Sequence, residues 1–276
     1  MNPTIPIYVC CHQKCQLPDN ELLVPVQAGR ASAGFRLDMA GDDSGENISL
    51  RNQNFCELSV LYWIWRNTGH DCFGLCHYRR FFNLAGNDTE LESLEDFTAQ
   101  SGHTAENLQQ LMEKWDLIVP AAKSKENGSS LYKLYAAAHH LNDMNLALAI
   151  IRDVYPEMIP AAQNVIFKQT RAYYKNMMIC HRDFADAYCR WLFDVLRRLD
   201  NLIYPQLDKR TPYQQRVYGF LGERLFNIFL EYYRRHHPLR IKEVPLLIYQ
   251  QPATEEIPLW QTALSEKSAW HTALNI

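Results

Sequence analysis

The sequence predicts an α/β fold, and three consecutive segments support this prediction. Residues 5–11 form a short apolar run with β-branched and aromatic side chains, which is typical of a strand. Residues 54–67 place apolar side chains at helical spacing and also on the other faces, which indicates a buried helix. A second apolar run over 72–78 predicts another buried strand. Strand, helix and strand in this order favour a parallel sheet.

The rest of the chain is predicted to form a long loop, further strands and a helix-rich C-terminal half. Residues 12–50 are rich in turn residues without a recognisable element, so we expect a long loop. Residues 84–112 are polar and helical in parts, and Pro120 ends a strand over 116–120. By the same criteria we expect helices over 131–154, 184–199 and from Thr211-Pro212 to about 235, and strands over 173–179 and 240–249.

No internal repeat and no linker rich in Pro, Gly or Ser divides the chain. We therefore expect a single domain over residues 1–250. The remaining residues, 251–276, are expected to form a loosely held tail.

Composition excludes several classes of protein. The formal charge of the 276 residues is −3, so the chain has no net positive charge that would attract it to nucleic acid. No apolar run reaches the roughly 18–20 residues of a membrane-spanning helix. The first residues lack the pattern of a signal peptide, and most of the eight cysteines lie in apolar segments. These features predict reduced thiols and a cytoplasmic location.

The segment His77-Tyr78-Arg79-Arg80 follows directly on the second buried strand. Ligands of open α/β sheets bind at the carboxyl ends of strands, and a guanidinium group bonds phosphate oxygens in a bidentate way. In an extended strand Arg79 and Arg80 would point to opposite faces, so both reach one ligand only if the chain turns here. Surface ion pairs with Asp or Glu account for the arginines equally well.

Polar residues also precede the predicted helix over 54–67. Asn47, Ser49 and Asn52 carry amide and hydroxyl groups that suit an anion or a polyhydroxylated ligand at a helix N-terminus. Spacing alone favours the alternative, ordinary N-capping, because Ser and Asn are common caps.

The last long predicted helix places Arg216, Gly219 and Glu223 on one face. Gly219 and Gly222 each cost roughly 1 kcal/mol in a helix interior relative to Ala, so something is expected to approach closely there. Glu223 is therefore a candidate general base with Arg216 to hold or tune it. An internal salt bridge between the two side chains is the structural alternative.

Asn176 lies in the apolar run over 173–179, where a buried amide needs partners. It could present its amide to a sugar hydroxyl. Alternatively, it bonds the backbone as a core residue.

Several well-known motifs are missing. The chain contains no G-x-G-x-x-G, no P-loop, no nucleophile elbow and no D-x-D sequence. Cys10, Cys11, His12 and Cys15 lack a second ligand pair at zinc spacing, so we do not expect zinc.

Taken together, these segments resemble a family of bacterial glycosyltransferases of capsule, exopolysaccharide and lipopolysaccharide synthesis, first catalogued only as a domain of unknown function. The resemblance extends from Ile7 to about Ile248. The matching segments are GENIS at 45–49, NFCELSVLYWIWRN at 54–67, GLCHYRRFF at 74–82, NMMI at 176–179 and GFLGERL at 219–225.

The resemblance implies a glycosyltransferase-A-like nucleotide-binding sheet flanked by helices. It implies that the donor is a nucleoside-diphosphate sugar, with a UDP-sugar the favoured candidate. It implies that the acceptor is a growing surface glycan, with a lipid-linked glycan the favoured candidate. Many enzymes of that fold hold a divalent cation with Asp-x-Asp at the end of a central strand, where this chain has His77-Tyr78-Arg79-Arg80. We expect these cations to replace the metal in neutralising the leaving diphosphate, while Mn²⁺ or Mg²⁺ remains the alternative.

The resemblance also implies residue roles. Glu223 is the expected base, with Glu57 second. The other expected substrate-binding residues contact the diphosphate, the nucleotide or the sugar: His77, Tyr78, Arg79, Arg80, Asn47, Ser49, Asn52, Asn176 and Arg216.

Two other classes of function remain open. A non-catalytic glycan- or partner-binding protein would also use the six Trp and fifteen Tyr residues, but would ignore UDP. A metal-dependent hydrolase would require a bound metal. For a lipid-linked acceptor we expect peripheral attachment at the inner face of the cytoplasmic membrane, with the basic clusters 197–198 and 234–237 as candidate contacts.

Overall fold

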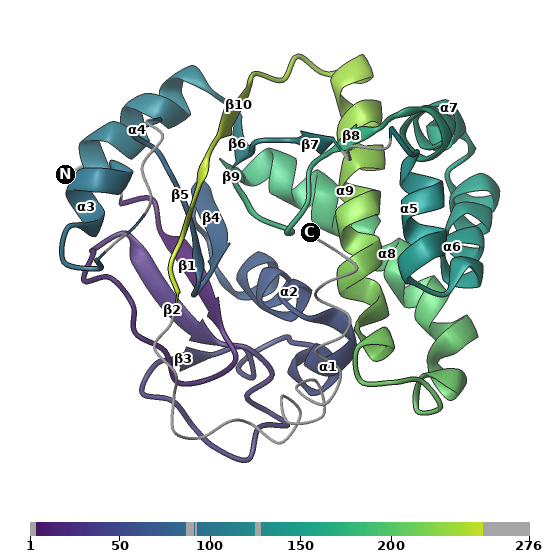
Figure 1. The fold of residues 1–276 in the computed structure, drawn as a ribbon, viewed down its shortest axis with the longest axis horizontal. Coiled ribbons are helices and arrows are strands. Elements are labelled where there is room, and N and C mark those ends of the chain that lie inside the picture. The colour runs from purple at the N-terminus through teal and green to yellow at the C-terminus, as the bar shows by residue number, and fades with distance from the viewer. Residues whose placement is uncertain (1–3, 87–90, 92, 125–127, 251–276) are drawn as a thin grey trace.

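A mixed sheet forms the centre of the protein (Figure 1). The structure is a computed structural model, and it describes residues 4–86, 91, 93–124 and 128–250. Seven strands follow one another across the sheet: β3 (Ala40–Gly41), β2 (Leu23–Gln27), β1 (Ile7–Cys11), β4 (Cys72–His77), β9 (Met178–His181), β6 (Leu117–Pro120) and β10 (Ile241–Val244). The sheet is extended by β5 (Arg80–Phe82), which pairs with β4 and with β11 (Leu246–Ile248).

Strand directions confirm the parallel layer predicted from the N-terminal third. β1 runs parallel to β2 on one side and to β4 on the other, with Ile7 opposite Leu23 and Gly74. β9 is antiparallel to both of its neighbours, β4 and β6. β10 lies at the edge, parallel to β6, as expected for the start of the segment 240–249.

Helices cover both faces of the sheet, because its central strands are apolar on both sides. All five residues of β1 are buried, and alternate residues belong to different cores. Helices α3 (Phe97–Ser101) and α4 (Ala105–Lys114) cover one face, whereas α2 (Leu58–Asn67), α8 (Arg182–Leu207) and α9 (Val217–His236) cover the other (Figure 1).

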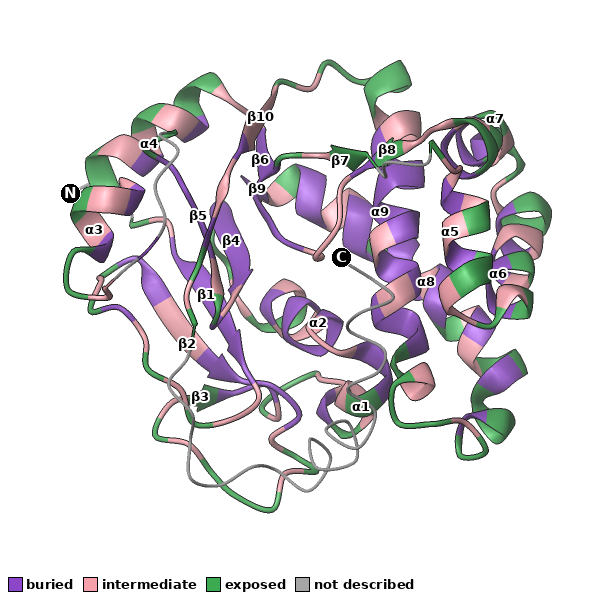
Figure 2. Ribbon diagram, viewed as in Figure 1, coloured by how far each residue is buried: buried purple, intermediate pink, exposed green. Residues whose placement is uncertain are grey.

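The C-terminal half is helical, as predicted. Helices α5 (Leu131–Ala138), α6 (Leu141–Val154) and α7 (Ile159–Gln163) lie beyond α9, and a π-helix, η3 (Asn164–Lys168), follows them. Figure 2 shows the buried stripes of α8 and α9 turned toward their neighbours. None of the helices in the described ranges combines the length and apolar character that a membrane span requires.

Five predicted elements are wrong in their boundaries. The expected loop over 12–50 contains β2 and β3. The sequence does not predict β2 because the segment is apolar over only five residues and lacks a clear period. The helix predicted over 54–67 is two helices, α1 (Asn52–Phe55) and α2, separated where Cys56 adopts φ 53°. The helix predicted over 131–154 is likewise interrupted at His139 and His140.

The last two corrections concern the strand predicted over 173–179 and the helix predicted from Thr211. Residues 173–177 are not a strand: β9 begins at Met178, and a short strand, β8 (Arg171–Ala172), pairs with β7 (Lys123–Ser124). Thr211 does not open α9 directly. Its hydroxyl accepts a hydrogen bond from the amide of Gln214, and a 3₁₀ turn, η4 (Gln214–Arg216), precedes α9. The tail expected over 251–276 lies outside the described residues.

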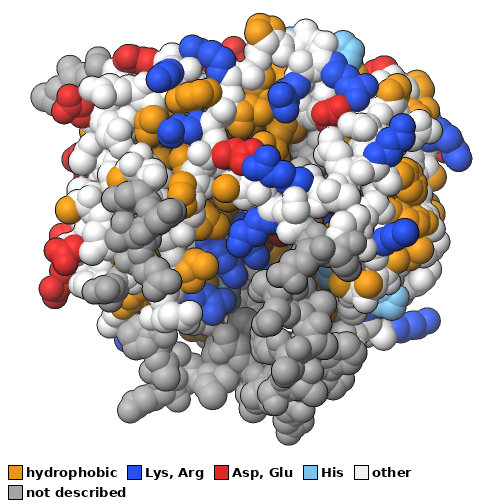
Figure 3. Space-filling view, turned by 45° about the horizontal axis from the view of Figure 1, so that its top comes forward, with side chains coloured by type: hydrophobic (Ala, Val, Ile, Leu, Met, Phe, Trp, Pro, Cys, Tyr) orange, Lys and Arg blue, Asp and Glu red, His pale blue; other side chains and the backbone are white. Residues whose placement is uncertain are grey.

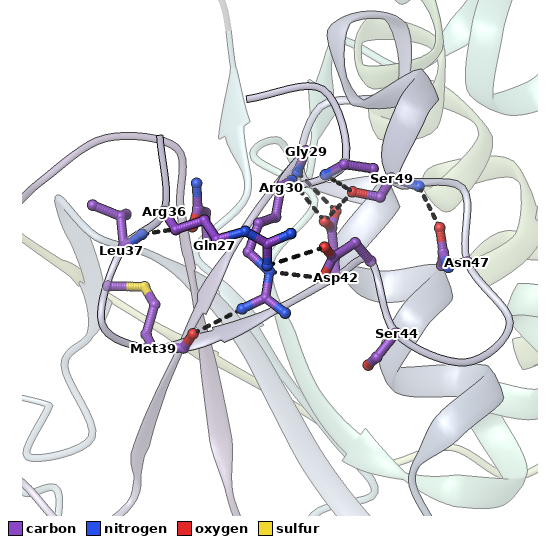
Figure 4. A network of polar contacts seen from close by, with 12 residues as sticks. Gln27, Gly29, Arg30, Arg36, Leu37, Met39, Asp42, Ser44, Asn47 and Ser49 are labelled. Carbon is purple, nitrogen blue, oxygen red and sulfur yellow. Dashed lines mark hydrogen bonds and ion pairs between the residues drawn. The ribbon is translucent and has the colours of Figure 1, made fainter. Parts of the chain in front are cut away.

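A buried carboxylate organises the loops after β2 and β3 (Figure 4). Asp42 is fully buried and accepts hydrogen bonds from the backbone amides of Gly29 and Arg30 at 2.9 and 3.2 Å. The hydroxyls of Ser49 and Ser59 donate to the same carboxylate at 2.5 and 2.6 Å. One side chain therefore joins the loop after β2, the turn at Ser49 and the first turn of α2.

Glycine allows α9 to approach the segment between α1 and α2. A Cβ atom at Gly219 would lie 2.9 Å from the sulfur of Cys56. At Gly222 it would lie 2.8 Å from Cδ1 of Leu58. The close approach that two helix-interior glycines predicted is confirmed, and the neighbour is the segment that carries Glu57.

Asp42→Ala is expected to lower the free energy of unfolding by roughly 3 kcal/mol, because buried donors would lose their acceptor. Urea unfolding measures this loss. Asp43→Ala is the matched control, since Asp43 only pairs with Arg30 and Arg36 near the surface, and should cost about 1 kcal/mol or less. Equal losses in the two variants would contradict the organising role of Asp42.

Gly219→Ala is expected to destabilise the protein by about 1–3 kcal/mol through overpacking, despite the better helix propensity of alanine. Gly69→Ala is the control, because Gly69 has nothing within 4 Å of an added Cβ. Both are measured by urea unfolding. A Gly219→Ala variant as stable as the wild type would show that α9 can move away from Cys56 at no cost.

Candidate active site

The polar segment after β4 folds back on itself. Tyr78 and Arg79 form a turn, and β5 returns antiparallel to β4 with Arg80 opposite His77. The guanidinium of Arg80 lies 3.3 Å from Nδ1 of His77, and Arg79 is exposed with its guanidinium 5.0 Å from the centre of the Tyr78 ring. The chain therefore makes the turn that both arginines need in order to serve one ligand.

Glu57 lies across from this turn, at the start of α2. Its Oε1 atom lies 3.9 Å from Nε2 of His77 and accepts a hydrogen bond from the Asn176 amide at 2.7 Å. The same amide nitrogen donates to the carbonyl of Gly219 at 3.0 Å. Asn176 thus joins α2 and α9, and Glu57 faces the end of β4.

Glu223 lies on α9 beside Lys175. Its Oε1 accepts the backbone N–H of Lys175 at 2.8 Å, and its Oε2 accepts a hydrogen bond from Arg224 at 2.7 Å. Arg216 instead donates from Nε to the sulfur of Cys56 at 3.2 Å. Arg216 and Glu223, both described, therefore do not form the salt bridge that the sequence offered as the structural alternative.

Backbone strain is concentrated in the same place. In the described part of the chain, the non-glycine residues with positive φ are Cys56 at 53°, Lys175 at 87° and Asn176 at 48°. Positive φ is costly for side chains other than Gly, Asn and Asp, and such strain gathers at functional sites. Asn176 was predicted in a strand, but it lies in this turn with its side chain aimed at Glu57.

We name this group of side chains the cationic site: Glu57, His77, Arg79, Arg80, Lys175, Asn176, Arg216 and Glu223. Among the described residues, Arg79, Arg80 and Lys175 form no ion pair with a carboxylate. Burial, and then the charge of Arg79, lowers the pKa of Arg80, while burial and then Arg80 lower the pKa of Lys175. In the described part of the chain these cations therefore have no carboxylate at ion-pair distance, although Glu57 and Glu223 act on Arg80 and Lys175 through their charge.

His77 is neutral in this environment. Burial, followed by the charges of Arg80 and Lys175, lowers its pKa to about 3. Nε2 of His77 and Oδ1 of Asn176 are buried and have no hydrogen-bond partner in the described ranges. Buried polar atoms are nearly always paired, so these two atoms leave hydrogen-bonding capacity unsatisfied next to Glu57.

No group of three His, Cys, Asp or Glu side chains suited to a metal occurs in the described residues. Mg²⁺ also binds through one or two carboxylates together with substrate phosphates, so the metal dependence of this site stays a prediction. At the end of β4 the arginines and Lys175 supply positive charge.

The residues predicted before the buried helix contact the protein itself. Asn47 donates to the carbonyl of Gly45 and accepts the amide of Ser49, whose hydroxyl donates to Asp42. Asn52 donates to the carbonyl of Cys56 and to Ser59, both at 2.8 Å. Neither the 3₁₀ turn η1 (Ser49–Arg51) nor α1 has a side-chain N-cap. Asn52 supports the strained Cys56, and nucleotide contacts of Asn47, Ser49 and Asn52 stay predictions.

One member of the site, Lys175, and one residue that supports it, Arg224, are absent from the sequence-based site prediction. Lys175 directly precedes Asn176, and a basic residue beside a polar one inside an apolar run is a signal that sequence reasoning could have used. Arg224 follows Glu223 and holds its carboxylate, but adjacent residues on a helix do not face each other in general, so spacing argued against the pair.

Comparison with known proteins agrees with this geometry. The chain superposes on a solved structure of WbbM, described as a bifunctional glycosyltransferase in the apo form, with a TM-score of 0.83 and 27% identity. The match covers 93% of this chain and 48% of WbbM, so the chain spans about half the length of that protein. No functionally curated protein matches the chain.

The structural similarity confirms the predicted glycosyltransferase-like α/β fold with a helix-rich C-terminal half. Residues 6–235 match the family described as "Domain of unknown function (DUF4422)". That range includes the strands β1, β4 and β9 and the whole cationic site. The resemblance seen in the sequence is thereby confirmed, and the chain belongs to the DUF4422 family.

Proposed function

We propose that this protein is a glycosyltransferase that moves a sugar from a nucleoside-diphosphate sugar, UDP-linked by preference, to a hydroxyl of a bacterial surface glycan. One observation carries the proposal: at the carboxyl end of β4, cations that form no ion pair with a described carboxylate lie around an acidic side chain, Glu57. The similarity to WbbM, whose description names a bifunctional glycosyltransferase, supports the same class of reaction.

The cations suit a leaving diphosphate. Arg79 and Arg80 provide guanidinium groups that bond phosphate oxygens in pairs, and Lys175 adds a point charge. Bond cleavage at the anomeric carbon places negative charge on the diphosphate, so fixed positive charge there lowers the barrier. This arrangement would replace a divalent cation, and we propose that transfer needs no metal.

Contacts favour Glu57 over Glu223 as the general base. Both oxygens of Glu223 already accept hydrogen bonds, one of them from Arg224. Glu57 accepts from Asn176 through Oε1, and its Oε2 has no donor within the described ranges. Oε2 is therefore available to take a proton from an acceptor hydroxyl.

The reaction follows from these positions. The acceptor oxygen attacks the anomeric carbon while the bond to the diphosphate breaks, and the hydroxyl proton passes to Glu57. The transition state resembles an oxocarbenium ion, as in glycoside hydrolysis. The Asn176 amide holds Glu57, and the neutral His77 offers Nε2 to a hydroxyl of the sugar or the acceptor.

A lipid-linked acceptor and attachment to the inner face of the membrane remain part of the proposal, but the expected basic contacts are mostly ion-paired. Arg197 and Arg198 bond Asp194, and Arg235 bonds Glu231. Arg234 has no ion pair among the described residues.

UDP at about 100 times its dissociation constant is expected to stabilise the protein by about 2.7 kcal/mol, with or without EDTA. The shift should disappear in Arg79→Ala and Arg80→Ala, because each loses a diphosphate contact. Arg190→Ala is the control, since Arg190 is exposed on α8 away from the site. Thermal unfolding measures the shift.

Stabilisation that requires Mn²⁺ would contradict the metal-independent site while keeping the transferase. Absence of any response to UDP or other nucleotides would favour a glycan-binding protein.

Glu57→Gln is expected to lower the transfer rate about a thousandfold, because the amide cannot accept the proton. UDP stabilisation should persist. Glu223→Gln should keep more activity, since Glu223 acts by holding Lys175 and its turn. UDP release from UDP-sugars with extracted surface glycan measures the rates. An active Glu57→Gln beside an inactive Glu223→Gln would return the role of base to Glu223.

A further inference from the structure

A second polar cavity lies along α9, beyond the cationic site. It has a volume of about 410 Å³ and is enclosed by the segment 168–173, the C-terminal half of α9 and Glu243 of β10. Figure 3 turns the end of the molecule with β7 and β8 toward the viewer and shows Lys and Arg side chains there beside carboxylates. We call this cavity the α9 groove. Its volume suits a small ligand of several rings.

Fixed polar groups line the α9 groove. Glu243 accepts hydrogen bonds from Arg171 at 2.5 Å and from the Tyr173 hydroxyl at 2.8 Å. The Asn227 side chain accepts the amide N–H of Tyr173 at 2.9 Å and donates to its carbonyl at 2.7 Å. Asn227 also donates to the Glu223 carbonyl at 2.7 Å, so both of its amide hydrogens are used in holding Tyr173 against α9. The Tyr173 ring and the ion pair are thus held in place, and such groups bind sugar rings and hydroxyls.

The rim of the α9 groove carries unneutralised charge. Lys168 and Arg234 line it, are exposed and form no ion pair in the described residues. The two groove carboxylates are already ion-paired with other arginines, Glu243 with Arg171 and Glu231 with Arg235. An anionic group on a ligand would therefore meet two available cations.

The α9 groove lies next to the cationic site along α9. Glu223, Asn227 and Glu231 are spaced four residues apart on α9 and share one face, about 6 Å apart along the axis at each step. A void of about 10 Å³, with room for about one water molecule, is lined by Tyr173, Asn176 and Glu223 and shares Tyr173 with the groove. Lys168 ends the π-helix η3, and π-helical turns are frequent at functional sites.

We propose that the α9 groove is the acceptor subsite and that it binds a saccharide bearing a carboxylate or phosphate group. The inference rests on the proposed function and adds the place and charge of the acceptor to it. The anionic group lies between Lys168 and Arg234, and the sugar chain runs past Tyr173 toward Glu57. The carboxylate of a uronic acid and the phosphate of a lipid carrier present the same chemistry to the two cations.

Calorimetric titrations in saturating UDP test this inference with three saccharides of one length. They are trigalacturonate, maltotriose 1-phosphate and neutral maltotriose. The protein is compared with Lys168→Ser/Arg234→Ser and with the charge-matched control Lys133→Ser/Arg190→Ser, whose residues are exposed and lie outside the groove.

An anionic saccharide is expected to bind more tightly than maltotriose. It should lose about tenfold in affinity in the groove variant and nothing in the control, the loss expected for two charge-assisted hydrogen bonds. Preference for trigalacturonate identifies a uronate, and preference for the phosphate identifies a carrier-linked acceptor.

Two results separate the inference from the function on which it rests. If UDP stabilises the wild type but no anionic saccharide binds, or binding is equal in the groove variant, the acceptor subsite is overturned and the transferase stands. If UDP has no effect on the wild type, the proposed function fails and the inference fails with it. Thr170→Trp, which would fill the groove, gives a second variant should the double substitution unfold.

Discussion

The close approach of α9 to the segment between α1 and α2 is the constraint on which the candidate site depends. Gly219 and Gly222 leave no side chain between the helix and Cys56 or Leu58, so Asn176 can bond Glu57 and the Gly219 carbonyl together. A larger residue would separate these groups by more than a hydrogen bond spans. Two weak helix formers thus bring three distant parts of the chain within reach of one reacting centre.

The charges of the candidate site lower the stability of the folded protein. Burying a cation is costly unless it is paired, yet the half-buried Arg80 and Lys175 lie near each other and near Arg79 without an ion-pair partner among the described residues. The strained turn at Lys175 and the orphaned Nε2 of His77 add to that cost. Such a concentration of unfavourable terms is expected where a ligand supplies the missing negative charge and hydrogen bonds.

One face of α9 connects the two polar regions of the molecule. Glu223 belongs to the cationic site, while Asn227 and Glu231 belong to the α9 groove four and eight residues later. Tyr173 borders both cavities, held by Asn227 on its backbone and by Glu243 on its hydroxyl. A donor end and an acceptor end on one rigid helix would keep a fixed distance between the two substrates.

Local sequence determined the elements whose signal is local. The apolar runs of β1 and β4 and the spacing in α8 predicted the central strands and a long helix, and the basic turn after β4 pointed to the candidate site. Tertiary structure decided the rest, because side-chain partners come from segments far apart in the chain. The break at Cys56 appears only when α9 packs against it, and only the fold shows Arg216 bound to Cys56 and Arg224 bound to Glu223. The same holds for the choice between Glu57 and Glu223 as the carboxylate with an available oxygen. The contact of Glu57 with Asn176 spans 119 residues of sequence, and sequence spacing carries no information on it.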